Sequence, residues 1–274
     1  MKDSFINNHN LKTEKKKIIY KNNSLEIEYF FRPAGKETII YIHGLGSFKE
    51  DFIGAVESGE LKPYTLASFD FPGCGGSPYP ENMRLNIEDL VNITDLMLRE
   101  LDLNEFVVIG HSMGGIVALM YAKKFGKKIT KFINVEGNLC HRNCGTAREA
   151  IKSGFSYFEK NFFGKFKIET SKIENRGIKK YAETLEKHTS PKAFFDYCHT
   201  LVDYCDNFDL LKEMKELKIP RLYVYSEENK AIFHYLKELK KSGCEIKEIL
   251  GSNHFPNYDN PEAYYKTIRN FMER

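Results

Sequence analysis

The sequence predicts an α/β fold: a mostly parallel, eight-stranded sheet with helices on both faces and a helical insertion after the sixth strand. Short apolar runs, such as residues 37–42, 106–109 and 131–135, have the near-continuous hydrophobicity of strands that are buried on both faces. Segments with helical spacing alternate with these runs, which is the pattern of a parallel sheet covered by its crossover helices. The alternation breaks after residue 137 and resumes at Pro220, which indicates an insertion.

The N-terminal part is expected to form a hairpin after a loose arm. Residues 1–16 are polar, and we expect them to be loose. Residues 17–21 read as a short strand, and residues 25–31 alternate apolar and polar side chains as a half-buried strand does. The polar residues 22–24 suit a turn, so the two runs should pair with each other.

Strands and helices alternate from residue 37 onward. Beyond the strand at 37–42, the patterns predict a helix over 49–58, a strand over 64–69, a helix from the Asn86 cap to about Leu101, a strand over 106–109, a helix to Phe125 and a strand over 131–135. Further along they predict a strand over 222–225, a helix over 230–240, a strand over 245–250 and a last helix over 261–272. We therefore expect residues 17–137 and 216–274 to form one core domain.

Residues 138–215 are expected to form a helical cap. The segment has helical patterns but no run typical of a buried strand. It is rich in aromatic side chains: Phe155, Tyr157, Phe158, Phe162, Phe163, Phe166, Phe194, Phe195 and Tyr197. Most of them should form the core of the cap itself, and the others are available to line an apolar pocket.

The composition argues against several classes of protein. The 41 Lys and Arg and 38 Asp and Glu give a net charge of +3, and they are interleaved, so neither nucleic acid nor an anionic membrane is the expected main partner. No apolar run reaches the roughly 18 residues of a membrane span, and the N-terminus lacks the apolar core of a signal peptide, so we expect a cytoplasmic protein. The six scattered cysteines are expected to be free thiols, and we predict neither a metal nor another cofactor.

The segment 110–114, Gly-His-Ser-Met-Gly, lies between an apolar strand run and a helix pattern. A G-x-S-x-G pentapeptide in this context holds its serine on a sharp turn at the top of a sheet, with the hydroxyl exposed. Ser112 is therefore the candidate nucleophile. Because a glycine-rich turn with an incidental serine reads the same, the rest of the chain must support this interpretation.

Polar residues also follow other predicted strands, at the edge where active sites of such sheets lie. The turn at 43–46 follows the third strand, Glu227 and Glu228 follow the seventh, and His254 follows the last. A serine, acids and a histidine should therefore meet at one edge of the sheet. A serine hydroxyl is a weak nucleophile without an adjacent base, and we assign that role to His254.

These features together resemble the α/β-hydrolase family, and in particular its esterase- and lipase-like serine hydrolases with a helical cap. The resemblance runs from about Lys17 to the C-terminus. It rests on four segments in order: His-Gly-Leu-Gly at 43–46, D-x-P-G-x-G-G-S at 70–77, G-H-S-M-G at 110–114 and N-H-F-P-N-Y-D-N-P at 253–261. It implies a Ser-His-acid triad, with an oxyanion hole formed by the backbone N–H groups of Met113 and Leu45.

The acid departs from the common pattern of the family. Many relatives carry Asp at the position that Asn229 occupies here, and a neutral amide can orient an imidazole but cannot stabilise an imidazolium. One alternative is that Glu228 or Glu227 reaches in from the same loop. Another is Glu136, since some members of the fold supply the acid from the end of the sixth strand. We favour Glu136, because it directly follows a fully apolar strand; a chain without an acid stays open as well.

The resemblance implies hydrolysis of a small or medium, largely apolar carboxylic ester, thioester or lactone through an acyl-enzyme, with a small-molecule acyl substrate as the partner. A serine at the elbow argues against haloalkane dehalogenases and epoxide hydrolases, which use a carboxylate nucleophile. Carbon–carbon bond hydrolases, aminopeptidases, acyltransferases and cofactor-free peroxidases use the same triad and stay open. Asn229 also leaves open a ligand-binding relative with slow turnover. Nothing in the sequence specifies an oligomeric state.

Overall fold

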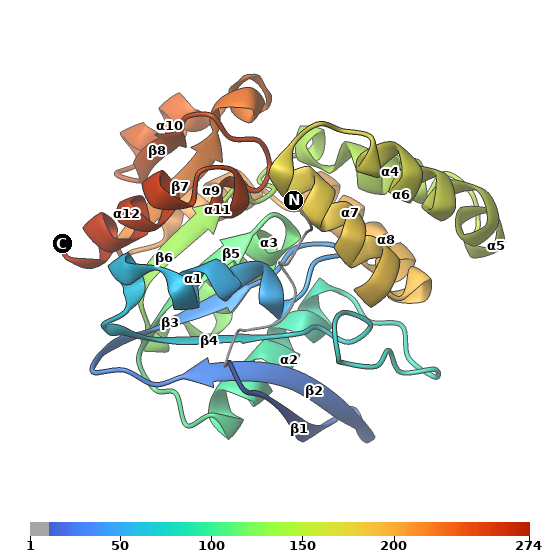
Figure 1. Cartoon of the computed structure of the whole chain (residues 1–274), viewed down its shortest axis with the longest axis horizontal. Coiled ribbons are helices and arrows are strands. Elements are labelled where there is room, and N and C mark those ends of the chain that lie inside the picture. Colours follow the sequence, from blue (N-terminus) through green and yellow to red (C-terminus); the bar gives the residue numbers. More distant parts are fainter. Residues whose placement is uncertain (1–10) are drawn as a thin grey trace, which may run out of the picture.

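The computed structural model describes residues 11–274 and shows one eight-stranded sheet with helices on both faces (Figure 1). The strands are β1 (Thr13–Tyr20), β2 (Asn23–Arg32), β3 (Lys36–Ile42), β4 (Tyr64–Phe69), β5 (Phe106–His111), β6 (Ile129–Val135), β7 (Arg221–Ser226) and β8 (Glu245–Ile249). Their order in the sheet is β1-β2-β4-β3-β5-β6-β7-β8. Only β2 runs antiparallel to its neighbours, β1 and β4, and all other pairs are parallel. The predicted fold class is confirmed.

The first strand begins earlier than predicted. β1 starts at Thr13, so the expectation of a loose arm over residues 1–16 is wrong for residues 13–16, which pair with β2. The polar composition of this stretch misled the prediction. An edge strand has a solvent-facing side that accepts charges, and Lys15 there pairs with Glu26 at 2.8 Å. The expectation for residues 1–10 lies outside the described residues.

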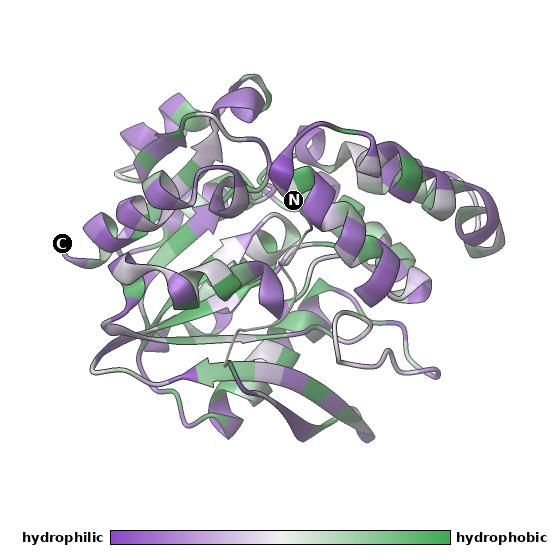
Figure 2. Cartoon of the chain, viewed as in Figure 1, coloured by the Kyte–Doolittle hydropathy of each residue, from purple (hydrophilic) through white to green (hydrophobic). Residues whose placement is uncertain are grey.

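The core helices and short 3₁₀ turns cover both faces of the sheet. They are η1 (Lys49–Phe52), α1 (Ile53–Glu57), η2 (Gly59–Leu61), α2 (Ile87–Glu100), α3 (Met113–Phe125), η3 (Gly126–Lys128), η6 (Glu227–Ile232), α10 (Leu236–Lys241), α11 (Pro256–Asp259) and α12 (Pro261–Met272). Ile40 and Val108 pack with α2 and α3 in one apolar cluster, and Ile39 and Val107 pack with α1 and α12 in the other. Neighbouring strand residues thus serve opposite faces, and Figure 2 shows the central strands as mainly hydrophobic. Within residues 11–274, no helix has the length and hydrophobicity needed to cross a membrane.

The helix predicted over 230–240 is interrupted. η6 ends at Ile232 and α10 begins only at Leu236. Between them Phe233 and Tyr235 are both buried against Tyr223 of β7. Residues two apart lie on different sides of a helix, so a continuous helix could not bury both rings in the same place.

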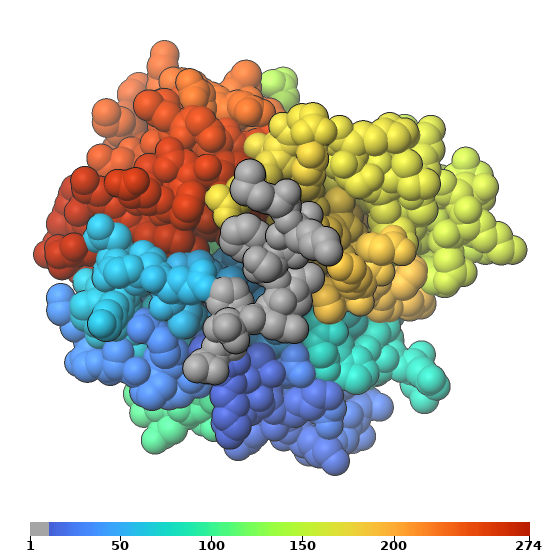
Figure 3. Space-filling model, viewed as in Figure 1, coloured from blue at the N-terminus to red at the C-terminus, as the bar shows by residue number. Residues whose placement is uncertain are grey.

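A helical insertion follows β6, as predicted. It contains η4 (His141–Cys144), α4 (Gly145–Ala150), α5 (Phe155–Tyr157), the π-helical turn η5 (Phe158–Phe163), α6 (Gly164–Ser171), α7 (Arg176–His188), α8 (Pro191–Asn207) and α9 (Leu210–Glu216). Phe158 stacks or tilts against Phe155, Phe162, Phe163, Phe194 and Phe195, so many of the aromatic side chains pack on one another. Figures 1 and 3 show the green to yellow helices as a lobe beside the red C-terminal part of the core.

The turn at residues 70–77 holds the insertion against the core. The Tyr197 hydroxyl donates a hydrogen bond to the Pro72 carbonyl at 2.7 Å, and the Ser190 N–H donates to the Gly73 carbonyl at 2.8 Å. The turn is itself fixed from inside, because the buried Asp70 carboxylate accepts hydrogen bonds from backbone and side chain of Lys49 at 2.7 and 2.9 Å. The α7–α8 junction is therefore fastened to a rigid part of the core.

Candidate active site

Ser112 alone connects β5 to α3, because the strand ends at His111 and the helix begins at Met113. Its φ of 53° and ψ of −124° lie in a region that a residue with a side chain rarely adopts. The Ser112 N–H donates to the Val135 carbonyl at 3.0 Å, and the Ser112 carbonyl accepts from the Gly115 N–H at 2.8 Å. Strain of this kind persists only where the surroundings enforce it, and it is concentrated at functional sites.

The glycines on either side of Ser112 are required by close packing. A Cβ atom at Gly114 would overlap the carbonyl oxygen of Ile42, and one at Gly110 would overlap the carbonyl of Gly114. The first turn of α3 thus lies directly against β3 and the end of β5, without space for a side chain. This is the strand–turn–helix geometry that the pentapeptide predicts.

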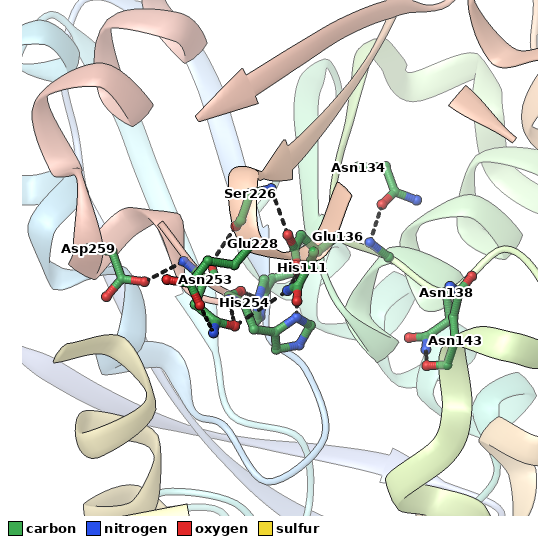
Figure 4. Close-up of polar contacts among 12 residues, drawn as sticks. His111, Asn134, Glu136, Asn138, Asn143, Ser226, Glu228, Asn253, His254 and Asp259 are labelled. Atoms are coloured by element: carbon green, nitrogen blue, oxygen red, sulfur yellow. Dashed lines mark hydrogen bonds and ion pairs between the residues drawn. The ribbon is translucent and has the colours of Figure 1, made fainter. Parts of the chain in front are cut away.

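His254 lies in the loop between β8 and α11, and its Nδ1 is 2.7 Å from Oε2 of Glu136 (Figure 4). About a third of its side chain is exposed. The loop is held from below by His111, whose Nε2 lies 2.8 Å from the His254 carbonyl oxygen. Burial lowers the pKa of His111 to about 3, so this imidazole is neutral and donates Nε2–H to that carbonyl. His111 therefore positions the loop that carries His254.

Glu136 directly follows β6, and its side chain is almost completely buried. Its φ of 51° is positive, which is uncommon for a residue that is not glycine. The carboxylate accepts hydrogen bonds from the Ser226 N–H on Oε1 and from the Asn229 side-chain amide on Oε2, both at 2.7 Å. Burial alone would raise the pKa of Glu136, but the hydrogen bonds from His254 and Ser226 hold it below its ordinary value of 4.5. Glu136 is therefore a buried carboxylate that is ionised at neutral pH.

The other two candidate acids occupy different positions. Glu228 accepts a hydrogen bond from the Asn253 side-chain amide at 2.6 Å, and Glu227 accepts one from the Gly251 N–H at 2.8 Å. Both residues are exposed. Within residues 11–274, the Nδ1 of His254 is hydrogen bonded to Glu136 and to neither of them. The contact between Asn229 and Glu136 could not be predicted from the sequence, where Asn229 was notable only because it occupies the position at which many relatives carry Asp.

The turn after β3 lies against Ser112. A Cβ atom added at Gly44 would be 3.0 Å from the Cβ of Ser112, and Leu45 lines the same cavity as the serine. His43 fixes this turn, because its Nε2 accepts from the Phe71 N–H and its Nδ1 donates to the Gly44 carbonyl, both at 2.9 Å. Burial lowers the pKa of His43 to about 4, which keeps the ring neutral as these two bonds require.

Met113 and Leu45 are the two residues to whose backbone N–H groups the resemblance assigns an oxyanion hole. Met113 is the first residue of α3, where an N–H group has no acceptor within the helix. The carbonyl of Leu45 accepts a hydrogen bond from the Tyr181 hydroxyl of α7 at 2.9 Å, which ties this turn to the insertion. Met113 directly follows Ser112 in the chain, and Leu45 lines the same cavity as the serine.

A cavity of about 340 Å³ opens at Ser112 and His254 between the core and the insertion. Its apolar walls include Phe166, Ile173, Ile178, Leu201 and Ile232, and its polar lining includes Asn138, Asn143, Thr146 and Asn229. The volume is within the range of small-molecule sites. Ile173 and Ile232 are each almost half exposed, so they stand at the rim of the cavity.

Asp259 connects the His254 loop to the insertion. Its carboxylate accepts from the Asn253 N–H at 2.8 Å, and also from the Gly177 N–H at 2.8 Å and the Asn175 side chain at 3.0 Å. Asn175 caps α7, so the N-terminus of that helix and the residue before His254 share one acceptor.

All six cysteines are free thiols, and no group of three or more His, Cys, Asp or Glu side chains in residues 11–274 is arranged to hold a metal ion. Cys140 and Cys144, which are close in sequence, instead contact Asn143 Oδ1 at 3.3 Å and the His141 carbonyl at 3.2 Å.

The mostly parallel sheet with its helical insertion, the strained serine between β5 and α3, and the histidine–carboxylate pair at the strand ends are features of the α/β-hydrolase fold. The chain belongs to the alpha/beta hydrolase family, whose model matches residues 39–267.

Similar proteins include two from mycoplasmas. "Putative esterase/lipase 2" of Mycoplasma genitalium is 24% identical over 260 residues, which cover 92% of this chain and 96% of that protein. "Putative esterase/lipase 3" of Mycoplasma pneumoniae is 25% identical over 279 residues, covering 90% of this chain and 92% of that one.

Solved structures show the same fold. A structure from a study of Nitrososphaera gargenis carboxylesterases has a TM-score of 0.78 at 15% identity and covers 94% of this chain and 98% of that one. A thermophilic esterase from Thermogutta terrifontis has a TM-score of 0.74 at 17% identity and covers 95% and 98%.

Proposed function

We propose that this protein is a serine esterase that hydrolyses small or medium, largely apolar carboxylic esters, thioesters or lactones through an acyl-enzyme. The observation that carries the proposal is the 2.7 Å contact between the buried Glu136 carboxylate and Nδ1 of His254, a histidine that lines the same cavity as Ser112. A carboxylate, an imidazole and a serine in this order are the groups that nucleophilic acyl transfer needs. Relatives named as esterases or lipases support the same class.

In the proposed reaction Ser112 is the nucleophile and His254 the base. The serine oxygen attacks the acyl carbonyl while His254 Nε2 takes the hydroxyl proton, and the charge of Glu136 stabilises the resulting imidazolium. The backbone N–H groups of Met113 and Leu45 donate to the oxyanion. The intermediate collapses to the acyl-enzyme, and the leaving alcohol takes the proton from His254. Water then repeats the sequence, so the acid is released and Ser112 is restored.

Three observations support Glu136 as the acid. Its Oε2 is within hydrogen-bond distance of His254, its side chain is almost completely shielded from solvent, and its backbone has a positive φ. A buried, strained carboxylate has little structural benefit of its own, because burial of a charge is costly unless it is paired. Glu228 has none of these features, since it is exposed and bound to Asn253.

The cavity supports the proposed substrate class. Its volume of about 340 Å³ accommodates a small or medium molecule, and the insertion supplies the apolar side chains of Phe166, Ile178 and Leu201. Such walls favour an alkyl or aryl group next to the ester, while they offer no charged side chain for an anionic one.

A fluorophosphonate probe and a panel of p-nitrophenyl esters of graded acyl length test the proposal. Wild-type protein should be labelled and should hydrolyse the shorter esters, whereas Ser112→Ala should lose both properties. Ser24→Ala, at an exposed serine of β2, is the matched control and should behave as wild type. A folded wild-type protein that is neither labelled nor active would overturn the proposal and favour a ligand-binding role.

A further inference from the structure

We propose that Asn229 is a positioning residue: its side-chain amide holds Glu136 against His254, and it must stay neutral for as long as position 136 carries the charge. This inference rests on the proposed function, because it concerns the same histidine and its acid. It assigns a role to the one residue that, from the sequence, counted against an active triad.

The first observation is that two donors converge on one oxygen. Asn229 Nδ2 lies 2.7 Å from Glu136 Oε2, and His254 Nδ1 lies 2.7 Å from the same atom. The Ser226 N–H occupies the other oxygen, also at 2.7 Å. A glutamate side chain has three rotatable bonds, so donors on both oxygens restrict the carboxylate to the orientation in which Oε2 faces the imidazole.

The second observation is that Asn229 also approaches the backbone of the histidine. Its Nδ2 is 3.5 Å from Asn253 Oδ1, and that oxygen accepts the His254 N–H at 2.6 Å. Asn253 is in turn held by Glu228 (Figure 4). Asn229 therefore lies between the acid and the segment that carries the base, and it contacts both.

The third point concerns charge. Only the amide nitrogen of Asn229 can face the Glu136 carboxylate, because its oxygen would meet another acceptor. An aspartate at 229 would bring a second carboxylate to the buried Glu136 carboxylate, and two carboxylates at this distance cannot both ionise without strong repulsion. If Glu136 is removed, the repulsion disappears, and an aspartate at 229 is left with the imidazole as its neighbour.

The same substitution should therefore have opposite effects in two backgrounds. Asn229→Asp should lower kcat/KM for a short p-nitrophenyl ester roughly tenfold at neutral pH when Glu136 is present. In a Glu136→Gly background it should raise kcat/KM roughly tenfold relative to Glu136→Gly alone, because it returns a carboxylate to the imidazole. Glycine is chosen at 136 because it tolerates the φ of 51° and leaves space for the aspartate side chain.

The pH profile separates positioning from a merely structural role. Without its amide donor, the Glu136 carboxylate is held less firmly against His254, so the protonated imidazole loses part of its stabilisation. Asn229→Ala should therefore move the acid limb of the kcat/KM profile to lower pH, whereas a structural defect would lower the curve equally at every pH. Asn104→Asp is the matched control, because Asn104 is exposed and precedes the N-terminal end of β5, opposite the strand ends that carry the site. The variant should have the rates and the pH profile of the wild type.

Melting temperatures give a readout that needs no turnover. Asn229→Asp should lower Tm at neutral pH in the Glu136 background and should not lower it after Glu136→Gly. Changes in Tm of opposite sign in the two backgrounds support the inference, and they can be measured even if the protein is inactive. In that case only the proposed esterase activity fails. Effects of equal sign and size in both backgrounds, in Tm and in kcat/KM of an active enzyme, would overturn the inference and leave the proposed function intact.

Discussion

Replacing Glu136 by Gln keeps the shape of the side chain and removes its charge. The Ser226 N–H, 2.7 Å from Oε1, requires an oxygen at that end of the amide. The amide NH₂ must then face His254 Nδ1 and the NH₂ of Asn229, which lie 2.7 Å from Oε2 in the native protein. His254 can satisfy this arrangement only with an unprotonated Nδ1, so its proton moves to Nε2, the nitrogen that should accept the proton of Ser112.

The expected loss is large. An amide in place of the triad acid gives the wrong histidine tautomer, and in a Ser-His-Asp protease this lowers kcat by about 10⁴. At about 1.36 kcal/mol per factor of ten, the loss corresponds to roughly 5.4 kcal/mol of transition-state stabilisation. KM should change little, because Glu136 lies behind the imidazole and does not line the cavity.

Steady-state hydrolysis of a short p-nitrophenyl ester measures this effect directly, with a melting curve to show that the variant folds. Glu228→Gln is the comparison at the rival acid, and it should retain most of the wild-type kcat because its carboxylate contacts Asn253. A Glu136→Gln enzyme within about threefold of wild type would refute the assignment of the acid. A loss confined to Glu228→Gln would move the assignment to that residue.

Other changes should have effects of predictable direction. Gly114→Ala forces a Cβ atom against the Ile42 carbonyl oxygen, so it should lower both Tm and activity, as thermal unfolding and ester hydrolysis will show. Lys49→Met leaves the buried Asp70 carboxylate without its cation and should cost about 3–5 kcal/mol in urea unfolding; an unchanged midpoint would contradict this. The pKa of Glu136 is lowered from 4.5, so its contribution to stability is complete above pH 4.5 and is lost as the pH falls through the lower folded value. Wild-type Tm should therefore decrease more steeply below pH 4.5 than that of Glu136→Gln, and parallel curves would exclude this linkage.

The fold could be predicted because its signals are local. Buried parallel strands need continuous apolar runs, and the turns at 43–46 and 110–114 need glycine where backbone segments approach closely. The errors occur where solvent contact or tertiary packing outweighs the local pattern. β1 extends to Thr13 because an edge strand accepts charged residues, and the helix expected over 230–240 is interrupted because Phe233 and Tyr235 are both buried.

The site could be predicted only in part, because hydrogen-bond partners depend on three-dimensional distances. The end of a buried strand singled out Glu136, but nothing in the sequence showed that Ser226 and Asn229 would both donate to it. Asn229 was interpreted as the absence of an acid, and the structure shows a donor to one. Whether the Glu228 carboxylate can contact His254 also depends on the path of the loop after β7, which the sequence does not specify.

The Asp259 carboxylate has a consequence for how a substrate reaches the serine. Asp259 binds both the start of α7 and the residue before His254. That end of the insertion therefore cannot move outward without also moving the loop that carries His254. This end of the insertion is therefore a fixed attachment and not a lid that opens. Substrate and product would then pass at the rim of the cavity, where Ile173 and Ile232 are almost half exposed, while the start of α7 and the histidine loop stay joined.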